Sequence, residues 1–86
     1  MKFSDQVVSA LKAMHPGVRK DIRRALTEVD RGRMRDIKPL TNQLMGFWRL
    51  RVGRHRIIFR YTAGEMIAEY LGPRESVYKD FKPPSV

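Results

Sequence analysis

The sequence predicts an α+β fold in which a two-helix hairpin packs on a small antiparallel β-sheet. Apolar residues recur at helical spacing as far as residue 31, and from Phe47 onward they alternate with polar residues as in strands. Glycine-containing turns separate the alternating stretches, which is typical of hairpins. The 86 residues are enough for one domain, 1–86, with a thin core because so short a chain buries only about 60% of its unfolded surface.

Two helices are expected in the first part of the chain. The first covers residues 4–15 with Ser4 as its N-cap, and Pro16 ends it and suits the first turn of the next helix. The second covers residues 17–31, and Gly32 stands where a C-cap glycine belongs. Each helix has one apolar side, so the pair needs a sheet to cover it.

A long connection over residues 33–46 precedes three strands. Its possible apolar anchors are Met34, Ile37, Leu40 and Leu44. The strands are expected at residues 47–52, 56–61 and 66–71. Gly53-Arg54 joins the first two as a two-residue loop with glycine first, which suits a type II′ turn. Gly72-Pro73 then ends the sheet, a short helical turn follows from residue 74, and the tail, 79–86, is expected to be irregular.

The hairpin register follows from this turn and divides the residues between two faces. Val52 pairs with His55 and Arg51 with Arg56, and side chains alternate between the faces along each strand. The face predicted to pack on the helices carries Trp48, Leu50, Val52, Ile57, Phe59 and Tyr61. The opposite face carries Arg49, Arg51, Arg56 and Arg60, with Phe47 and Ile58 between them. Because like charges directly opposite one another destabilise a hairpin, this face is a candidate anion site; the alternative is a solvated basic surface.

The charge balance indicates a polyanionic partner. Lysine and arginine number 18 against nine acidic residues, which gives a formal net charge of +9, and twelve of the cations are arginine. The planar arginine fork fits phosphate and stacks on bases, so nucleic acid, most of all RNA, is favoured over a membrane surface. High-GC codon usage is the alternative explanation for the arginines.

Other classes of site find little support in the sequence. The chain has no cysteine, and its two histidines, His15 and His55, have no carboxylate cluster beside them, so neither disulfides, a metal nor a cofactor is expected. A protein partner is therefore the expected source of extra stability. No signal-peptide pattern and no apolar run of about 20 residues occurs, which predicts a soluble cytoplasmic protein.

Two segments of the sequence resemble the RelE/ParE superfamily, the toxins of type II toxin–antitoxin systems, and are closer to the RelE branch. The first runs from Trp48 to Phe59 and contains R-x-R and G-x-x-R; the second, from Leu71 to Tyr78, contains R-x-x-x-Y. The likeness extends over about residues 4–80. It implies a RelE-like fold, in which an N-terminal strand would be very short or absent here because few residues precede the first helix.

The resemblance also implies a function and partners. RelE-branch toxins cut mRNA in the ribosomal A site, whereas ParE-branch toxins inhibit DNA gyrase without nuclease activity. A metal-independent endoribonuclease acting through the RNA 2′-hydroxyl is therefore expected, with a cognate antitoxin, the ribosome and mRNA as partners. The alternatives are a gyrase inhibitor and an inactive relative that still binds an antitoxin.

The family motifs imply which residues act on RNA. The catalytic set implied is Arg49, Arg51, Arg56, Arg74 and Tyr78. Arg56 and Arg74 match phosphate-binding arginines, and Tyr78 matches a tyrosine that stacks on a base or helps to transfer protons. RelE members carry lysines at positions 49 and 51, and since arginine stays protonated it is a poor base. Proton abstraction is thus unassigned, and Glu75, the only carboxylate nearby, is interpreted as a solvated charge. Further candidates for RNA contact are Arg54, Arg60, Arg23, Arg24 and Lys79.

Overall fold

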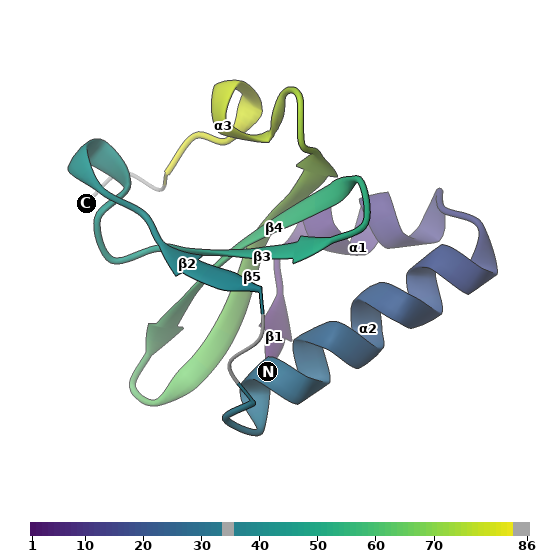
Figure 1. Cartoon of the computed structure of the whole chain (residues 1–86), viewed down its shortest axis with the longest axis horizontal. Coiled ribbons are helices and arrows are strands. Elements are labelled where there is room, and N and C mark those ends of the chain that lie inside the picture. Colours follow the sequence, from purple (N-terminus) through teal and green to yellow (C-terminus); the bar gives the residue numbers. More distant parts are fainter. Residues whose placement is uncertain (34–35, 84–86) are drawn as a thin grey trace.

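The structure, a computed structural model, describes residues 1–33 and 36–83 and confirms the predicted α+β class. Its sheet has five strands in the order β1-β5-β4-β3-β2. The strands are β1 Lys2–Phe3, β2 Ile37–Pro39, β3 Trp48–Val52, β4 His55–Thr62 and β5 Glu65–Pro73. The helices are α1 Asp5–Lys12, α2 Pro16–Asp30 and α3 Val77–Asp80, with a 3-10 turn at Asn42–Leu44. Figure 1 shows α1 and α2 on one side of the sheet and α3 on the other.

The first helix is shorter than predicted at its C-terminal end. Ser4 caps it as expected, since its Oγ accepts a hydrogen bond of 3.2 Å from the backbone N–H of Val7. The helix ends at Lys12, because a residue that precedes proline avoids helical angles, and His15 has ψ 138°. His15 instead caps α2, where its Nδ1 accepts a hydrogen bond of 3.1 Å from Gly17 N–H.

The predicted connection over residues 33–46 contains a strand that the sequence did not indicate. β2 pairs antiparallel with β3 and so becomes an edge of the sheet. Hydrogen bonds beyond each end hold it there, from Arg51 N–H to the Asp36 carbonyl at 3.0 Å and from Leu40 N–H to the Phe47 carbonyl at 2.9 Å. The proposed anchor Met34 lies outside the described residues.

The central hairpin has the predicted register. Val52 lies opposite His55 and Arg51 opposite Arg56. Gly53 has φ +57°, a left-handed value that glycine adopts without strain, as the first position of a type II′ turn requires. β5 continues two residues further than predicted and ends at Pro73, where the missing N–H costs little at the end of a ladder.

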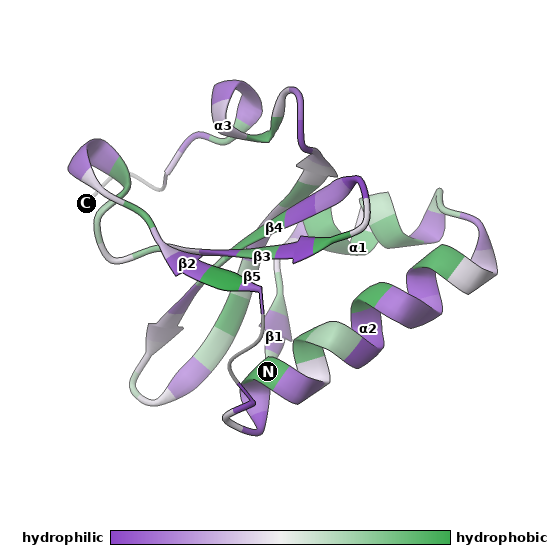
Figure 2. Cartoon of the chain, viewed as in Figure 1, coloured by the Kyte–Doolittle hydropathy of each residue, from purple (hydrophilic) through white to green (hydrophobic). Residues whose placement is uncertain are grey.

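Two apolar clusters lie on opposite faces of the sheet. On the helix side the core contains the buried residues Val7, Leu11, Ile22, Leu26, Val29, Leu50, Ile57, Phe59, Met66, Ala68 and Leu71. Figure 2 shows apolar and polar residues interspersed along α1 and α2, as expected for helices with one buried side. Tyr61 was predicted on this face, but 46% of it is exposed because it lies at the far end of β4.

The second cluster, which we call the minor cluster, was not predicted. It consists of buried Ile58, Val77 and Phe81, with Leu40, Leu44, Phe47 and Tyr70 packed against them. It attaches α3 to the outer face of the sheet. Lys79 and Asp80 are therefore helical rather than part of an irregular tail, while residues 84–86 lie outside the described chain.

The N-terminal residues form the very short strand that the family resemblance allowed. β1 runs parallel to β5, with Lys2 opposite Ile67 and Phe3 opposite Ala68. After the strand ends, Gln6 continues the contact with β5: its Nε2 donates to the Leu71 carbonyl at 2.7 Å, and its Oε1 accepts from Leu71 N–H at 2.8 Å.

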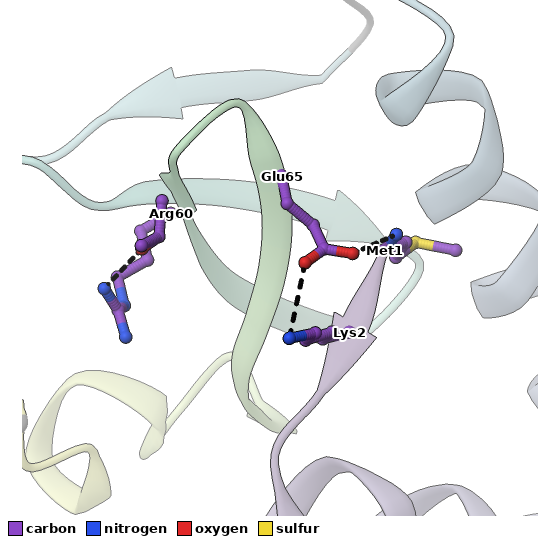
Figure 3. A network of polar contacts seen from close by, with 5 residues as sticks. Met1, Lys2, Arg60 and Glu65 are labelled. Carbon is purple, nitrogen blue, oxygen red and sulfur yellow. Dashed lines mark hydrogen bonds and ion pairs between the residues drawn. The ribbon is translucent and has the colours of Figure 1, made fainter.

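The chain start is also held to β5 by charge. Figure 3 shows Glu65 between the Met1 amino group and the Lys2 side chain, with nitrogen–oxygen distances of 3.4 and 3.5 Å. Because both cationic groups reach one carboxylate at the start of β5, the two-residue strand is fixed at its first residues as well as by its ladder.

Candidate nucleic-acid interface

Four arginines meet at the turn end of the central hairpin, on the face opposite α1 and α2. We call Arg49, Arg51, Arg56 and Arg74 the arginine cluster. β3 and β4 supply the first three, and the chain returns after β5 to supply Arg74, whose N–H donates to the Arg54 carbonyl at 2.9 Å. The predicted site residues from two distant segments are thus brought together.

Arg56 lies at the centre of the cluster and is only 8% exposed. Its Nη1 donates hydrogen bonds to the carbonyls of Gly53 at 3.0 Å and His55 at 2.9 Å, which fixes the guanidinium beside the turn. Loss of surrounding water lowers the pKa of Arg56, the other three cluster arginines lower it further, and Tyr78 partly raises it. Arginine nevertheless stays charged, so the cluster is a concentrated positive site.

Little negative charge within the protein offsets this cluster. Arg51 forms an exposed ion pair with Asp36 at 3.1 Å. Among the described residues, Arg49, Arg56 and Arg74 have no ion-pair partner. The Nε of Arg49 is buried and makes no hydrogen bond to any part of the chain that the structure describes. Uncompensated cations at close range favour binding of an anion with several oxygens, such as a phosphate.

The minor cluster positions Tyr78 beside these arginines. Val77 is fully buried, and Phe81 packs edge-to-face on Phe47 with ring centroids 5.3 Å apart. Tyr78 lies between those two anchors in α3 and is 45% exposed. An exposed aromatic ring on a fixed turn beside cations is suited to stacking on a base.

Other predicted RNA contacts differ in their relation to the cluster. Arg54 and Lys79 are exposed next to it, in the hairpin turn and in α3. Arg60 lies further along β4 and is engaged by Glu69, at 3.4 Å, and by the Thr62 hydroxyl, at 2.7 Å.

The structure separates the two candidates on α2 from the cluster. Arg23 and Arg24 belong to the helical layer, on the opposite side of the sheet. The Arg23 guanidinium lies over the Phe3 ring, 5.8 Å from its centroid, and Arg24 is exposed. One phosphate cannot contact both layers, because the sheet lies between them.

Lys38 was not predicted as a site residue, and the structure places it on this face. It pairs directly with Arg49 across β2 and β3, and residues directly opposite in an antiparallel pair point to the same face. The sequence signal was weak, because a three-residue strand that ends in proline resembles a loop.

Neither a cluster of metal ligands nor a membrane-spanning helix occurs in the residues that the structure describes. No three side chains of histidine, cysteine, aspartate or glutamate are grouped so as to hold a metal ion in residues 1–33 and 36–83. Of the helices within those ranges, none has the length and apolar character required to cross a membrane.

Comparisons with known proteins identify the fold. No protein-family model matches the sequence, and no curated protein matches it. A chain of the RelB–RelE antitoxin–toxin complex from Methanococcus jannaschii has a TM-score of 0.73 and 24% identity, over 95% of this chain and 100% of that one. A chain of the toxin–antitoxin complex RelBE2 from Mycobacterium tuberculosis has a TM-score of 0.72 and 21% identity, over 85% of this chain and 94% of that one. A chain of the YoeB–YefM complex from Staphylococcus aureus has a TM-score of 0.70 and 19% identity, over 81% of this chain and 90% of that one.

The chain therefore has the RelE-like fold, with two long helices against one face of a mostly antiparallel sheet and a very short N-terminal strand. The resemblance to the RelE/ParE superfamily that the hairpin motifs predicted is confirmed at the level of the fold.

Proposed function

We propose that this protein is the toxin of a toxin–antitoxin pair and acts as a metal-independent endoribonuclease that cuts mRNA on the ribosome, in the cytoplasm. The observation that carries the proposal is the arginine cluster with Tyr78 beside it, on a RelE-like fold. The four cations converge from two segments at a cost, because burial and then repulsion by the other three arginines lower the pKa of Arg56. A polyanionic ligand would offset that repulsion.

The arginine cluster supplies the positive charge that cleavage of a phosphodiester requires. The RNA 2′-hydroxyl attacks the adjacent phosphate, and negative charge builds up on the phosphorane oxygens. Fixed guanidinium groups stabilise this charge without reorganising. Arg56 is the most rigidly held, and Arg74 and Arg49 flank it. Tyr78 stacks on a base next to the scissile bond.

Dependence on the ribosome follows from the openness of this site. Tyr78 and Arg74 are both exposed to solvent in the described structure. An exposed site holds a flexible single strand poorly, and orientation of the reactants can contribute a large part of catalysis. The ribosome would supply that orientation by holding the mRNA.

An antitoxin is the proposed protein partner. Three of the neighbours' chains come from toxin–antitoxin complexes or the YoeB–YefM complex. The net charge of +9 favours a partner segment that is acidic. A short open reading frame beside the gene, encoding a chain that co-purifies with this protein and relieves its toxicity, would support the pairing.

The decisive experiment is primer extension on a defined mRNA in a translating extract, with ribosomes present or removed. We expect cuts at fixed codon positions only when ribosomes are present. Arg74→Ala and Tyr78→Ala should reduce these cuts while the protein stays folded, because the first removes a cation and the second removes the stacking ring. Intact mRNA with the wild-type protein, or full cleavage by both variants, would contradict the proposal.

Inhibition of DNA gyrase is the second candidate function. It is favoured by one specific observation, the presence of arginine at both positions 49 and 51, because guanidinium is a poor proton acceptor. A supercoiling assay separates the two functions: inhibition of gyrase with unchanged mRNA would identify the second.

A further inference from the structure

A lysine completes the face that carries the arginine cluster. Lys38 is exposed in β2 and directly opposite Arg49, so the two side chains extend from neighbouring strands on the same face. The other charged groups closest in the ladder are Arg51, two residues along β3, and Asp36, which holds Arg51 by their ion pair. The other strand lysine on this face, Lys2 in β1, lies across the sheet from the cluster, opposite Ile67, and forms an ion pair with Glu65. Among the described strands, Lys38 is therefore the lysine that is paired with a residue of the arginine cluster.

The backbone of Lys38 is held firmly although β2 is short. Hydrogen bonds from Arg51 N–H to the Asp36 carbonyl and from Leu40 N–H to the Phe47 carbonyl lie on either side of it. Leu40 also packs into the minor cluster, which carries α3 and Tyr78. The position of Lys38 is thus fixed relative to the arginines of β3 and relative to α3, which carries Tyr78.

Lysine supplies a chemical property that the cluster lacks. A guanidinium stays protonated, whereas an amine can release and accept a proton. We infer that Lys38 is the proton acceptor of this site and that its neutral amine takes the proton of the RNA 2′-hydroxyl. The inference rests on the proposed endoribonuclease function.

The proton transfers and bond changes of this step need no reactant other than the RNA, Lys38 and water. As the proton passes from the 2′-hydroxyl to Lys38 Nζ, the 2′-oxygen bonds to phosphorus and the bond from phosphorus to the 5′-oxygen breaks. The 5′-oxygen takes up a proton from water, and the Lys38 ammonium returns its proton to water. The products are a 2′,3′-cyclic phosphate and a 5′-hydroxyl. Arg49 stabilises the negative charge on the phosphorane that forms before these products separate.

Two substitutions with opposite properties test the assignment. Lys38→Arg keeps the positive charge but removes the proton acceptor, whereas Lys38→His, neutral above a pH of about 6.5, loses charge but keeps an acceptor. Lys12→Arg and Lys12→His are matched controls, because Lys12 is exposed at the end of α1 in the helical layer. The assay is single-turnover cleavage of ribosome-bound mRNA at pH 7.5, with ribosome binding and melting temperature measured in parallel.

We expect Lys38→Arg to slow cleavage by about 100-fold or more, the usual contribution of general base catalysis, with binding and melting temperature unchanged. Lys38→His should be at least about tenfold faster than Lys38→Arg, and both Lys12 controls should match the wild type. Wild-type cleavage by Lys38→Arg, or a larger loss in Lys38→His than in Lys38→Arg, would overturn the assignment but leave the proposed function standing. A wild-type protein that cuts no mRNA would overturn both.

Discussion

The two faces of the central hairpin use alternate residues of the same strands, yet they are built in opposite ways. On the helix side, Leu50, Ile57 and Phe59 belong to one continuous core covered by α1 and α2. On the outer side, Ile58 is buried as completely, but the minor cluster around it is small and arginines occupy the neighbouring positions.

This difference separates stability from function. Burial of apolar area on the helix side supplies most of the favourable free energy of folding. The outer side can then carry Arg51 directly opposite Arg56, a pairing that costs stability. Substitutions on the helix side should therefore change mainly the free energy of unfolding, and substitutions on the outer side mainly the rate of RNA cleavage.

The largest effect is expected in the helix-side core. Phe59→Ala should lower the free energy of unfolding by about 3–5 kcal/mol, since Phe59 is fully buried. A small domain has little more than this to lose. Urea denaturation measures the change, and Tyr61→Ala, two residues along the same strand but 46% exposed, is the control. Equal losses in the two variants would show that the helix-side core does not dominate stability.

The next effect concerns the arginine cluster and should leave stability intact. Arg56→Met keeps most of the buried stem but removes the central cation, so cleavage should fall by about 100- to 1,000-fold, or about 2.7–4 kcal/mol. Its melting temperature should not fall, because three repelling neighbours are relieved. Arg31→Met, exposed at the end of α2, is the control. A strongly destabilised Arg56→Met protein would mean that Arg56 serves the fold instead.

A smaller, mixed effect is expected in the minor cluster, where the two roles meet. Phe81→Ala should cost about 2 kcal/mol of stability, less than for a residue in a large core, because its site adjoins solvent. Cleavage should fall by about tenfold, since Tyr78 loses its support. Phe81→Leu should retain most of the stability and most of the cleavage rate of the wild type. An unchanged rate of cleavage in Phe81→Ala would show that packing of Phe81 is not needed to position Tyr78.

The smallest effect is expected at the ion pair beside the cluster. Asp36→Asn removes an exposed salt bridge to Arg51 and should change stability by about 0.2–1 kcal/mol. It also frees a cation, so RNA should bind more tightly at low salt. Filter binding at two salt concentrations measures this, with Asp30→Asn on α2 as the control. Weaker binding would show that Asp36 orients Arg51 for the substrate.

The regular parts of the molecule were predictable and the irregular parts were not. Strict alternation around Gly53 fixed the hairpin register, and apolar spacing indicated both long helices, because each pattern reports one buried side directly. β2 was missed, since three residues ending in Pro39 give no periodic signal. The minor cluster was missed because its members come from distant segments, and Phe47 and Ile58 on the basic face gave no sign of what would cover them.

The candidate site was predicted in part for the same reason. Arg51 and Arg56 follow from register alone, and the C-terminal motif brought in Arg74 and Tyr78. Lys38 depends on the unpredicted strand, so no local pattern could have placed it beside Arg49. Arg23 was predicted as a further RNA contact from its charge, and charge does not show which side of the sheet a helix covers; the structure places it in the helical layer.

The amide of Gln6 has a consequence for how molecules of this protein behave toward one another. By donating to and accepting from the Leu71 backbone, it acts as one more strand residue after β1 and closes the outer edge of β5. The opposite edge, β2, is only three residues long and ends in Pro39, which lacks an N–H. Open strand edges are templates for aggregation. With both edges blunted, the sheet resists edge-to-edge association even when the protein accumulates to high concentration.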